Sequence, residues 1–169
     1  MGGHQTRSRH SPKTSALGGR AVHLVDIENL CVNHSGQPIN TGVGDIYRSI
    51  VRPGPNDQFI VASDASRIFD ARREFQGARI VHGTGPDGAE VAIEHEVDLR
   101  HVATHFTTLV IASGDGYFTP TARRAQELGM RVVVVSRESC LARSLAHCTH
   151  GFIAFPDLNT HASEFTTAS

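Results

Sequence analysis

Two apolar runs, each followed within three residues by an acid, constrain the fold of this chain more than any other feature. The stretch Ala21–Asn29 begins with apolar residues and ends in Asp26, Glu28 and Asn29. A second run, Leu109–Ala112, leads into Ser-Gly-Asp-Gly with its acid at Asp115. Short apolar runs of this kind are typical of strands buried on both faces of a parallel sheet. Because ligands bind at the carboxyl edge of such a sheet, we expect Asp26 and Asp115 to meet there. The alternative is that each acid only caps the helix that follows it.

The remaining chain alternates between strand-like and helix-like segments. The expected strands after the first are Gln58–Ala62, Ala78–Val81, Thr108–Ala112, Arg131–Val135 and Gly151–Phe155. The expected helices are Asp45–Val51, Ser66–Phe75, Ala89–Phe106, Thr119–Leu128 with Thr119 as N-cap and Pro120 at the first position, and Ser139–His147. This alternation predicts an α/β fold of three layers, a Rossmann-like, doubly wound and mostly parallel sheet of about five or six strands.

Length and composition indicate one folded domain in a chain of 169 residues. We expect a disordered basic arm over residues 1–20, the domain over 21–156 and a flexible tail over 157–169; a solvated leader is the alternative for the arm. The three cysteines have no C-x-x-C spacing, and no apolar run approaches the length of a membrane span. These features favour a cytoplasmic protein. A net charge of −1 provides no global basic field for nucleic acid.

Acidic residues recur where successive strands or loops are expected to reach the carboxyl edge: Asp26, Asp64, Asp87 or Glu90, and Asp115. Carboxylates gathered in one cleft repel one another unless a cation is present. Mg²⁺ or Mn²⁺ suits such oxygen ligands, and a carboxylate-bound divalent ion is the usual equipment for phosphodiester hydrolysis.

Motifs for other chemistries are missing from the sequence. It contains no G-x-x-x-x-G-K-[ST] for a nucleotide triphosphate, no complete dinucleotide fingerprint and no G-x-S-x-G elbow. His101 and His105 are four residues apart but lack the glutamate of a zinc protease motif. His23 lies within the first strand, where we expect a hydrogen-bonded core residue.

Three motifs resemble those of NYN domains, which are PIN-like nuclease relatives. They are VDIENL at residues 25–30, GPDGAE at 85–90 and IASGDGYF at 111–118, and the resemblance extends from about Ala21 to Phe155. It implies a PIN-like parallel sheet, a metal-dependent ribonuclease activity, and Asp26, Asn29 and Asp115 as site residues. The chain departs from the family pattern at two positions, because Tyr117 and Glu90 stand where relatives commonly carry aspartates.

The candidate site therefore has three groups of residues. The expected metal ligands are Asp26, Glu90 and Asp115; Asn29 completes the catalytic set by positioning water or phosphate; the expected substrate-binding residues are Ser113, Arg67, Arg123 and Arg124. Each has a purely structural alternative: Glu90 as a helix N-terminal acid, Asn29 and Ser113 in turns, and the arginines on solvated helix faces. Similarly, Asp64 could cap a helix, Asp87 could serve its turn, and Glu94 and Asp98 could form a solvated face.

The leading hypothesis is a metal-dependent endoribonuclease that uses Mg²⁺ or Mn²⁺ and an RNA substrate. The alternative is a catalytically weak or inactive domain of the same family that binds RNA or a protein. A small-molecule phosphate hydrolase would need a D-x-D nucleophile, whereas Asp26-Ile27-Glu28 offers a glutamate. No membrane partner is expected, and a homodimer is left open.

Overall fold

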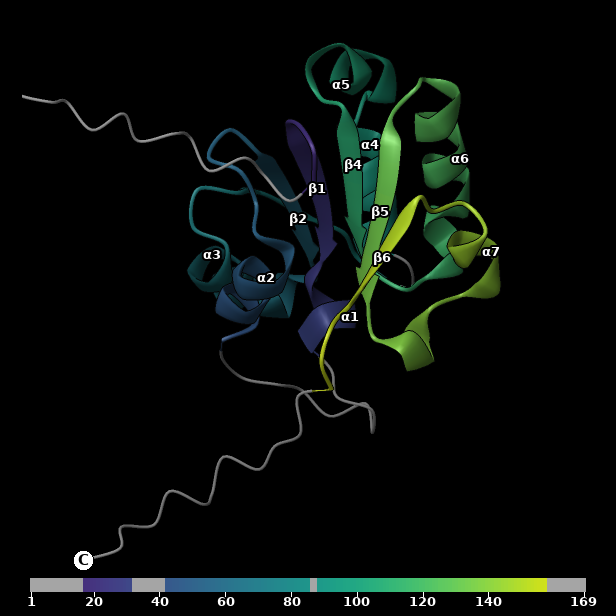
Figure 1. The fold of residues 1–169 in the computed structure, drawn as a ribbon. Helices are drawn as coiled ribbons and strands as arrows, with labels where there is room; N and C mark the ends of the chain where they lie inside the picture. The colour runs from purple at the N-terminus through teal and green to yellow at the C-terminus, as the bar shows by residue number, and fades with distance from the viewer. Residues whose placement is uncertain (1–16, 32–41, 86–87, 158–169) are drawn as a thin grey trace, which may run out of the picture.

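The computed structural model describes residues 17–31, 42–85 and 88–157. Within these ranges the chain forms one sheet of six strands, all parallel, flanked by helices on both faces (Figure 1). The strands are β1 (Ala21–Asp26), β2 (Gln58–Ser63), β3 (Arg79–His82), β4 (Thr108–Ala112), β5 (Arg131–Ser136) and β6 (Gly151–Ala154). The predicted three-layer α/β fold is confirmed.

The order of the strands across the sheet is β3-β2-β1-β4-β5-β6. The chain therefore winds in one direction from β1 to β3 and in the other from β4 to β6. The reversal lies between β1 and β4, where Val25 is paired with Ala112. In open α/β sheets the crevice at such a reversal, outside the carboxyl ends of the strands, is where ligands bind. The residues that follow β1 and β4 both lie at this reversal.

Two helical layers cover the sheet (Figure 1). One contains α1 (Ile27–Cys31), α2 (Val43–Val51) and α3 (Ile68–Glu74); the other contains α4 (Gly88–Glu96), α5 (Leu99–His105), α6 (Thr119–Glu127) and α7 (Arg143–Ala146). Alternate strand residues divide between the two cores. Val25 and Val110 belong to the first, and Leu24, Leu109 and Ile111 belong to the second. Both faces of the central strands are thus buried, as their largely apolar sequences predict.

His23, in the middle of β1, is a buried member of a polar network. Its Nδ1 lies 2.9 Å from the Tyr47 hydroxyl, its Nε2 lies 3.3 Å from Asp57 Oδ2, and its ring stacks on Phe59 at 4.3 Å between centroids. Burial lowers the pKa of His23, although Asp57 acts in the opposite direction. The prediction of a hydrogen-bonded core histidine is confirmed.

Two predicted helices are each interrupted. The segment 89–106 forms α4 and α5 rather than one helix, because Asp98 is the N-cap of α5 and accepts hydrogen bonds from the backbone of Arg100 and His101. The segment 139–147 forms a 3₁₀ turn, η3 (Glu138–Cys140), followed by α7, with extended backbone at Leu141 and Ala142. A carboxylate such as that of Asp98 can accept hydrogen bonds from backbone N–H groups and begin a new helix, instead of lying on the exposed face of a continuous one.

The start of α6 also differs from the prediction. Thr119 is the first residue of the helix rather than its N-cap, which is Phe118, the last residue of the 3₁₀ turn η2 (Gly116–Phe118). The Thr119 hydroxyl donates to Ser144 Oγ at 3.0 Å instead of capping the helix. It thereby connects α6 to α7.

The folded part begins earlier than the predicted boundary at Ala21. Leu17 is buried in the first core, and its carbonyl accepts a hydrogen bond from Thr108 Oγ1 at 3.3 Å. The guanidinium of Arg20 lies 4.7 Å from the centre of the Phe106 ring. Residues 1–16 of the predicted arm and 158–169 of the predicted tail lie outside the described residues.

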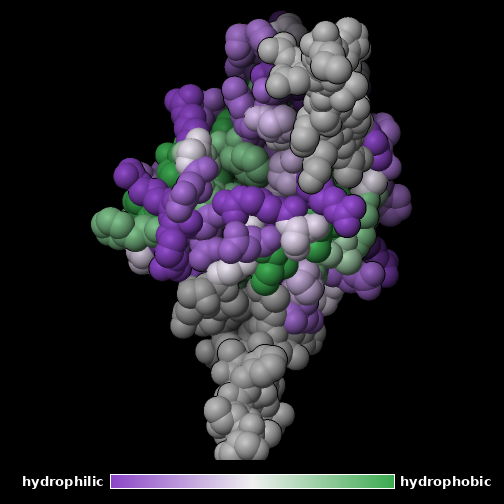
Figure 2. Space-filling model, turned by 60° about the vertical axis from the view of Figure 1, so that its left-hand side comes forward, coloured by the Kyte–Doolittle hydropathy of each residue, from purple (hydrophilic) through white to green (hydrophobic). Residues whose placement is uncertain are grey.

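On the side of α2 and α3, hydrophilic residues predominate and hydrophobic ones form separate groups among them (Figure 2). The large hydrophobic side chains that are exposed within the described ranges are Phe69, Val91 and Phe152, which lie on three different elements. None of the described helices is long and apolar enough to cross a membrane.

Candidate functional site

Asp26, the last residue of β1, is buried at the carboxyl ends of β1 and β4. Only 3% of the residue is exposed. Its Oδ1 accepts a hydrogen bond from the backbone N–H of Asn29 at 3.2 Å, and its Oδ2 accepts one from the Ser113 hydroxyl at 3.2 Å. The strand therefore delivers the carboxylate to the edge, and two hydrogen bonds fix the orientation of its plane.

Ser113, the first residue after β4, connects the two predicted aspartates. Its side chain is fully buried, and Oγ both donates to Asp26 and accepts from the backbone N–H of Asp115 at 3.2 Å. Asp115 is exposed, and its Oδ1 accepts from the backbone N–H of Tyr117 at 2.8 Å, which caps η2. The two aspartates thus lie at one edge of the sheet, as predicted. Asp115 also caps the helical turn that follows it, as the alternative interpretation expected.

Asn29 joins the first turn after β1 to the loop after β4. Its side-chain Oδ1 accepts from the backbone N–H of Gly114 at 3.1 Å, and its carbonyl accepts from Arg137 Nη2 at 2.8 Å. Arg137 follows β5 and is 4% exposed. Arg137 is not among the predicted site residues, although its position directly after a buried strand was a signal for it.

The electrostatic environment identifies the carboxylates that interact with Asp26. The pKa of Asp26 is raised from the usual 3.8 to about 7, first by burial and also by the nearby charges of Glu90 and Glu28. Burial also raises the pKa of Glu28, and the charges of Asp64 and Glu90 act in the same direction. The three carboxylates Asp26, Glu28 and Glu90 therefore share one region, and Glu90 is itself 8% exposed. Sequence analysis did not include Glu28 among the site residues, although it lies two residues after Asp26.

Asp64 and Arg67 lie beside this group. The backbone N–H of Asp64 donates to Glu28 Oε1, and the side chain of Asp64 caps η1 (Ala65–Arg67) by accepting from Ser66 and Arg67. The capping alternative for Asp64 is thus confirmed. The charge of Arg67 lowers the pKa of Glu28, which places this predicted substrate-binding residue near the carboxylates. Asp87 lies outside the described residues.

Arg123 and Arg124, both on α6, bond residues outside the group around Asp26. Arg123 Nε donates to Cys148 Sγ at 3.3 Å, whereas Arg124 Nη1 donates to Glu127 at 2.7 Å. These bonds do not include the group around Asp26.

Glu94 is not merely part of a solvated helix face. Its two carboxylate oxygens accept from the Tyr117 hydroxyl and from Thr121 Oγ1, both at 3.1 Å.

The donor chemistry of the site fits a hard divalent cation. Carboxylate oxygens are the ligands that Mg²⁺ and Mn²⁺ prefer, and a cation would relieve the repulsion among Asp26, Glu28 and Glu90. Within the described ranges, however, no three His, Cys, Asp or Glu side chains are grouped so that they could hold a metal ion.

Comparison with a solved structure supports the fold alone. The chain is similar to a protein of unknown function from Vibrio parahaemolyticus RIMD 2210633, with 17% identity and a TM-score of 0.55. The similarity covers 90% of this chain and 98% of the other. No curated protein matches the chain.

The family comparison agrees with the motifs at the crevice. The model of the NYN domain matches residues 20–159, which include both β1 and β4 and every candidate site residue. The chain therefore belongs to the NYN domain family, within the PIN-like ribonuclease superfamily.

Proposed function

We propose that this protein is a metal-dependent endoribonuclease that hydrolyses phosphodiester bonds of RNA at the crevice between β1 and β4. The observation that carries the proposal is the carboxylate of Asp26, which is buried at the reversal of strand order with the acids Glu90 and Glu28 beside it. Carboxylates with a perturbed pKa in such a position cluster at functional sites. Membership of the NYN family supports the same chemistry.

In this proposal Asp26, Glu90 and Asp115 would hold Mg²⁺ or Mn²⁺, and the ion would draw together side chains that do not form a ready-made ligand group within the described ranges. A bound ion of this kind supplies an activated water and neutralises charge on the phosphate. Ser113 fixes the plane of the Asp26 carboxylate through its 3.2 Å hydrogen bond, and Asn29 fixes the backbone of Gly114 next to Asp115. Arg67, beside Glu28, supplies a positive charge for the phosphate backbone of the substrate.

The second candidate function is an RNA- or protein-binding domain with weak or no catalysis. Tyr117 favours it, because this residue stands where relatives commonly carry an aspartate and its hydroxyl is bonded to Glu94. A tyrosine in that position cannot provide a carboxylate ligand, so the metal would be held by fewer acids.

Cleavage of end-labelled single-stranded RNA and of matched DNA tests the two functions. The reactions contain Mn²⁺, Mg²⁺ or EDTA, and the unmodified protein is compared with Asp115→Asn and Asp26→Asn. The nuclease proposal expects RNA cleavage that requires the metal and falls at least about a hundredfold in both variants, since each removes a charged ligand.

Asp45→Asn is the matched control, because Asp45 is an exposed carboxylate on α2 away from the crevice. Its activity should equal that of the unmodified protein, which excludes a contaminating ribonuclease as the source of any difference. Equal trace activity in all four proteins, or no cleavage with any ion, would refute the nuclease and leave the binding domain.

A further inference from the structure

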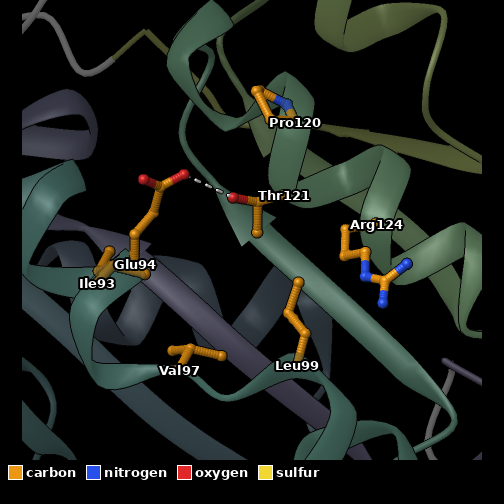
Figure 3. A pocket seen from close by; sticks show the side chains of 7 residues that line it. All are labelled: Ile93, Glu94, Val97, Leu99, Pro120, Thr121 and Arg124. Carbon is orange, nitrogen blue, oxygen red and sulfur yellow. Dashed lines mark hydrogen bonds between the residues drawn. The ribbon is translucent and has the colours of Figure 1, made fainter.

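An open pocket lies between α4, α5 and α6, beside the candidate site. It has a volume of about 330 Å³, and its walls are Ile93, Glu94, Val97, Leu99, Pro120, Thr121 and Arg124. Ligand sites range from ~300 to 1,000 Å³, so this pocket suits one small planar group. The lining is apolar in the middle and charged at two places, with Glu94 contributed by α4 and Arg124 by α6 (Figure 3).

Two hydrogen bonds hold the Glu94 carboxylate in place. Thr121 Oγ1 donates to Oε1 and the Tyr117 hydroxyl donates to Oε2, each at 3.1 Å. Figure 3 shows the first of these bonds at one end of the pocket. An ionised carboxylate has about four acceptor positions, so each oxygen can still accept a bond from a ligand. The side chain is thus pre-oriented as a forked acceptor.

Arg124 is the positive group of the pocket. Its present partner, Glu127, lies three residues along the same helix, and both side chains of this pair are substantially exposed. Exposed pairs of this kind contribute little, because water screens them. The Arg124 guanidinium can therefore leave Glu127 and donate to acceptor atoms of a ligand with little loss of free energy.

Tyr117 connects the pocket to the candidate site. Its hydroxyl bonds Glu94 in the pocket wall, and its backbone N–H bonds the carboxylate of Asp115. A strand of RNA whose phosphate lies at Asp115 therefore has the pocket within reach of a neighbouring base.

We propose that this pocket binds a guanine base of the RNA strand, adjacent to the phosphate that is cleaved; this inference rests on the proposed function. Guanine presents two adjacent N–H donor groups, at N1 and N2, which match the forked acceptor of Glu94. It also presents two acceptors, O6 and N7, which match the fork of an arginine. Leu99, Val97 and Pro120 contact the faces of the ring, as apolar side chains do for splayed bases of single-stranded RNA.

The other bases match this pair of charges less well. Adenine and cytosine each offer one amino group to the carboxylate, and uracil offers one N–H. Only guanine places two donors side by side against Glu94 while it keeps two acceptors for Arg124.

Titration of the isotope-labelled full chain with GMP, AMP and CMP, in EDTA and followed by amide NMR shifts, tests the proposal without any turnover. The three nucleotides carry the same ribose and phosphate, so a difference in affinity reports the base. We expect GMP to shift amides of α4, α5 and α6 and to bind about tenfold more tightly than AMP or CMP.

Variants of two arginines that are neighbours in the sequence distinguish the one that lines the pocket from the one that does not. Arg124→Gln and Glu94→Gln should each remove most of the preference for GMP. Arg123→Gln is the matched control, because this side chain bonds Cys148 and does not line the pocket, and it should keep the preference. Unchanged amide shifts away from the pocket show that each variant is folded.

Equal affinity for the three nucleotides, or a GMP preference that survives Arg124→Gln, overturns the proposal. Failure of the pocket and failure of the nuclease remain distinguishable. Metal-dependent RNA cleavage without a GMP preference overturns the pocket alone. A GMP preference in a protein that cleaves no RNA supports the pocket as a base site and refutes the nuclease.

Discussion

Asp26→Asn should stabilise the fold at neutral pH while it abolishes the proposed activity. The carboxylate is buried beside Glu90 and Glu28, and its pKa in the folded protein is about 7. Asparagine has nearly the same shape and carries no charge, so the variant avoids the cost of ionising this site. Its amide oxygen can accept only one of the two hydrogen bonds that Asp26 accepts, and this loss offsets part of the gain equally at every pH. A residue retained for its charge is expected to lower stability where that charge has no partner.

The magnitude follows from the pKa of the folded and unfolded states. When the pH rises from about 3.8 to about 7, the unfolded chain loses the Asp26 proton while the folded chain keeps it. The wild-type free energy of unfolding therefore falls across this window. At ~1.4 kcal/mol per pKa unit, the loss approaches about 4 kcal/mol above pH 7. Below pH 3.8 both states hold the proton and the loss vanishes.

Urea unfolding in EDTA at pH 5, 6, 7 and 8 measures this dependence. We expect the free energy of unfolding of Asp26→Asn to gain about 2.5 kcal/mol on that of the wild type between pH 5 and pH 8. Asp45→Asn, at an exposed carboxylate, should show differences within about 0.5 kcal/mol at every pH. A difference between Asp26→Asn and the wild type that does not change with pH would refute the reasoning.

Divalent cations provide a second readout of the same site. If Asp26 is a ligand, Mn²⁺ at a hundred times its dissociation constant should stabilise the wild type by about 2.7 kcal/mol. The same concentration should have little effect on Asp26→Asn. Equal stabilisation of both proteins would show that the ion binds elsewhere.

Two further substitutions test the framework of the sheet. Asp57→Asn should cost about 2–4 kcal/mol in urea unfolding, because Asp57 accepts hydrogen bonds at 2.8 Å from the backbone N–H groups of both Ala21 and Gly54, and an amide can satisfy only one of them. Gly114→Ala should lower the melting temperature by about 4–8 °C, because the added Cβ would lie 2.3 Å from the carbonyl oxygen of Cys140. A melting temperature within 1 °C of the wild type would contradict this close approach.

The sheet could be predicted from the sequence because buried parallel strands have a local signature. The runs that form β1 and β4 are largely apolar, and a polar residue marks the end of each, Asp26 as the last residue of β1 and Ser113 directly after β4, so their ends follow from the local sequence. The break at Asp98 could not be found in this way. An acid spaced four residues from Glu94 suits a solvated helix face and an N-cap equally well, and only the packing of α5 decides between them.

The candidate site was predictable only in part, because several of its contacts join residues that are distant in the sequence. Asp26 and Asp115 are recognised by their positions after strands, and the structure places them on one edge. The contribution of Glu28 depends on the turn that brings Asp64 beside it, and the bonds of Glu94 depend on Tyr117 and Thr121 across two helices. Such distant contacts leave no trace in the spacing of the sequence.

The hydrogen bond between Ser113 and Asp26 joins residues 87 positions apart. The two halves of the site therefore leave the ribosome at different times. Until β4 has been synthesised, β1 has no neighbour on that side and is not yet a central strand. Contacts of such long range are made slowly, because the loop between them has to close first. A nascent chain that stops before β4 has no assembled crevice, so any activity of this protein is a property of the completed domain alone.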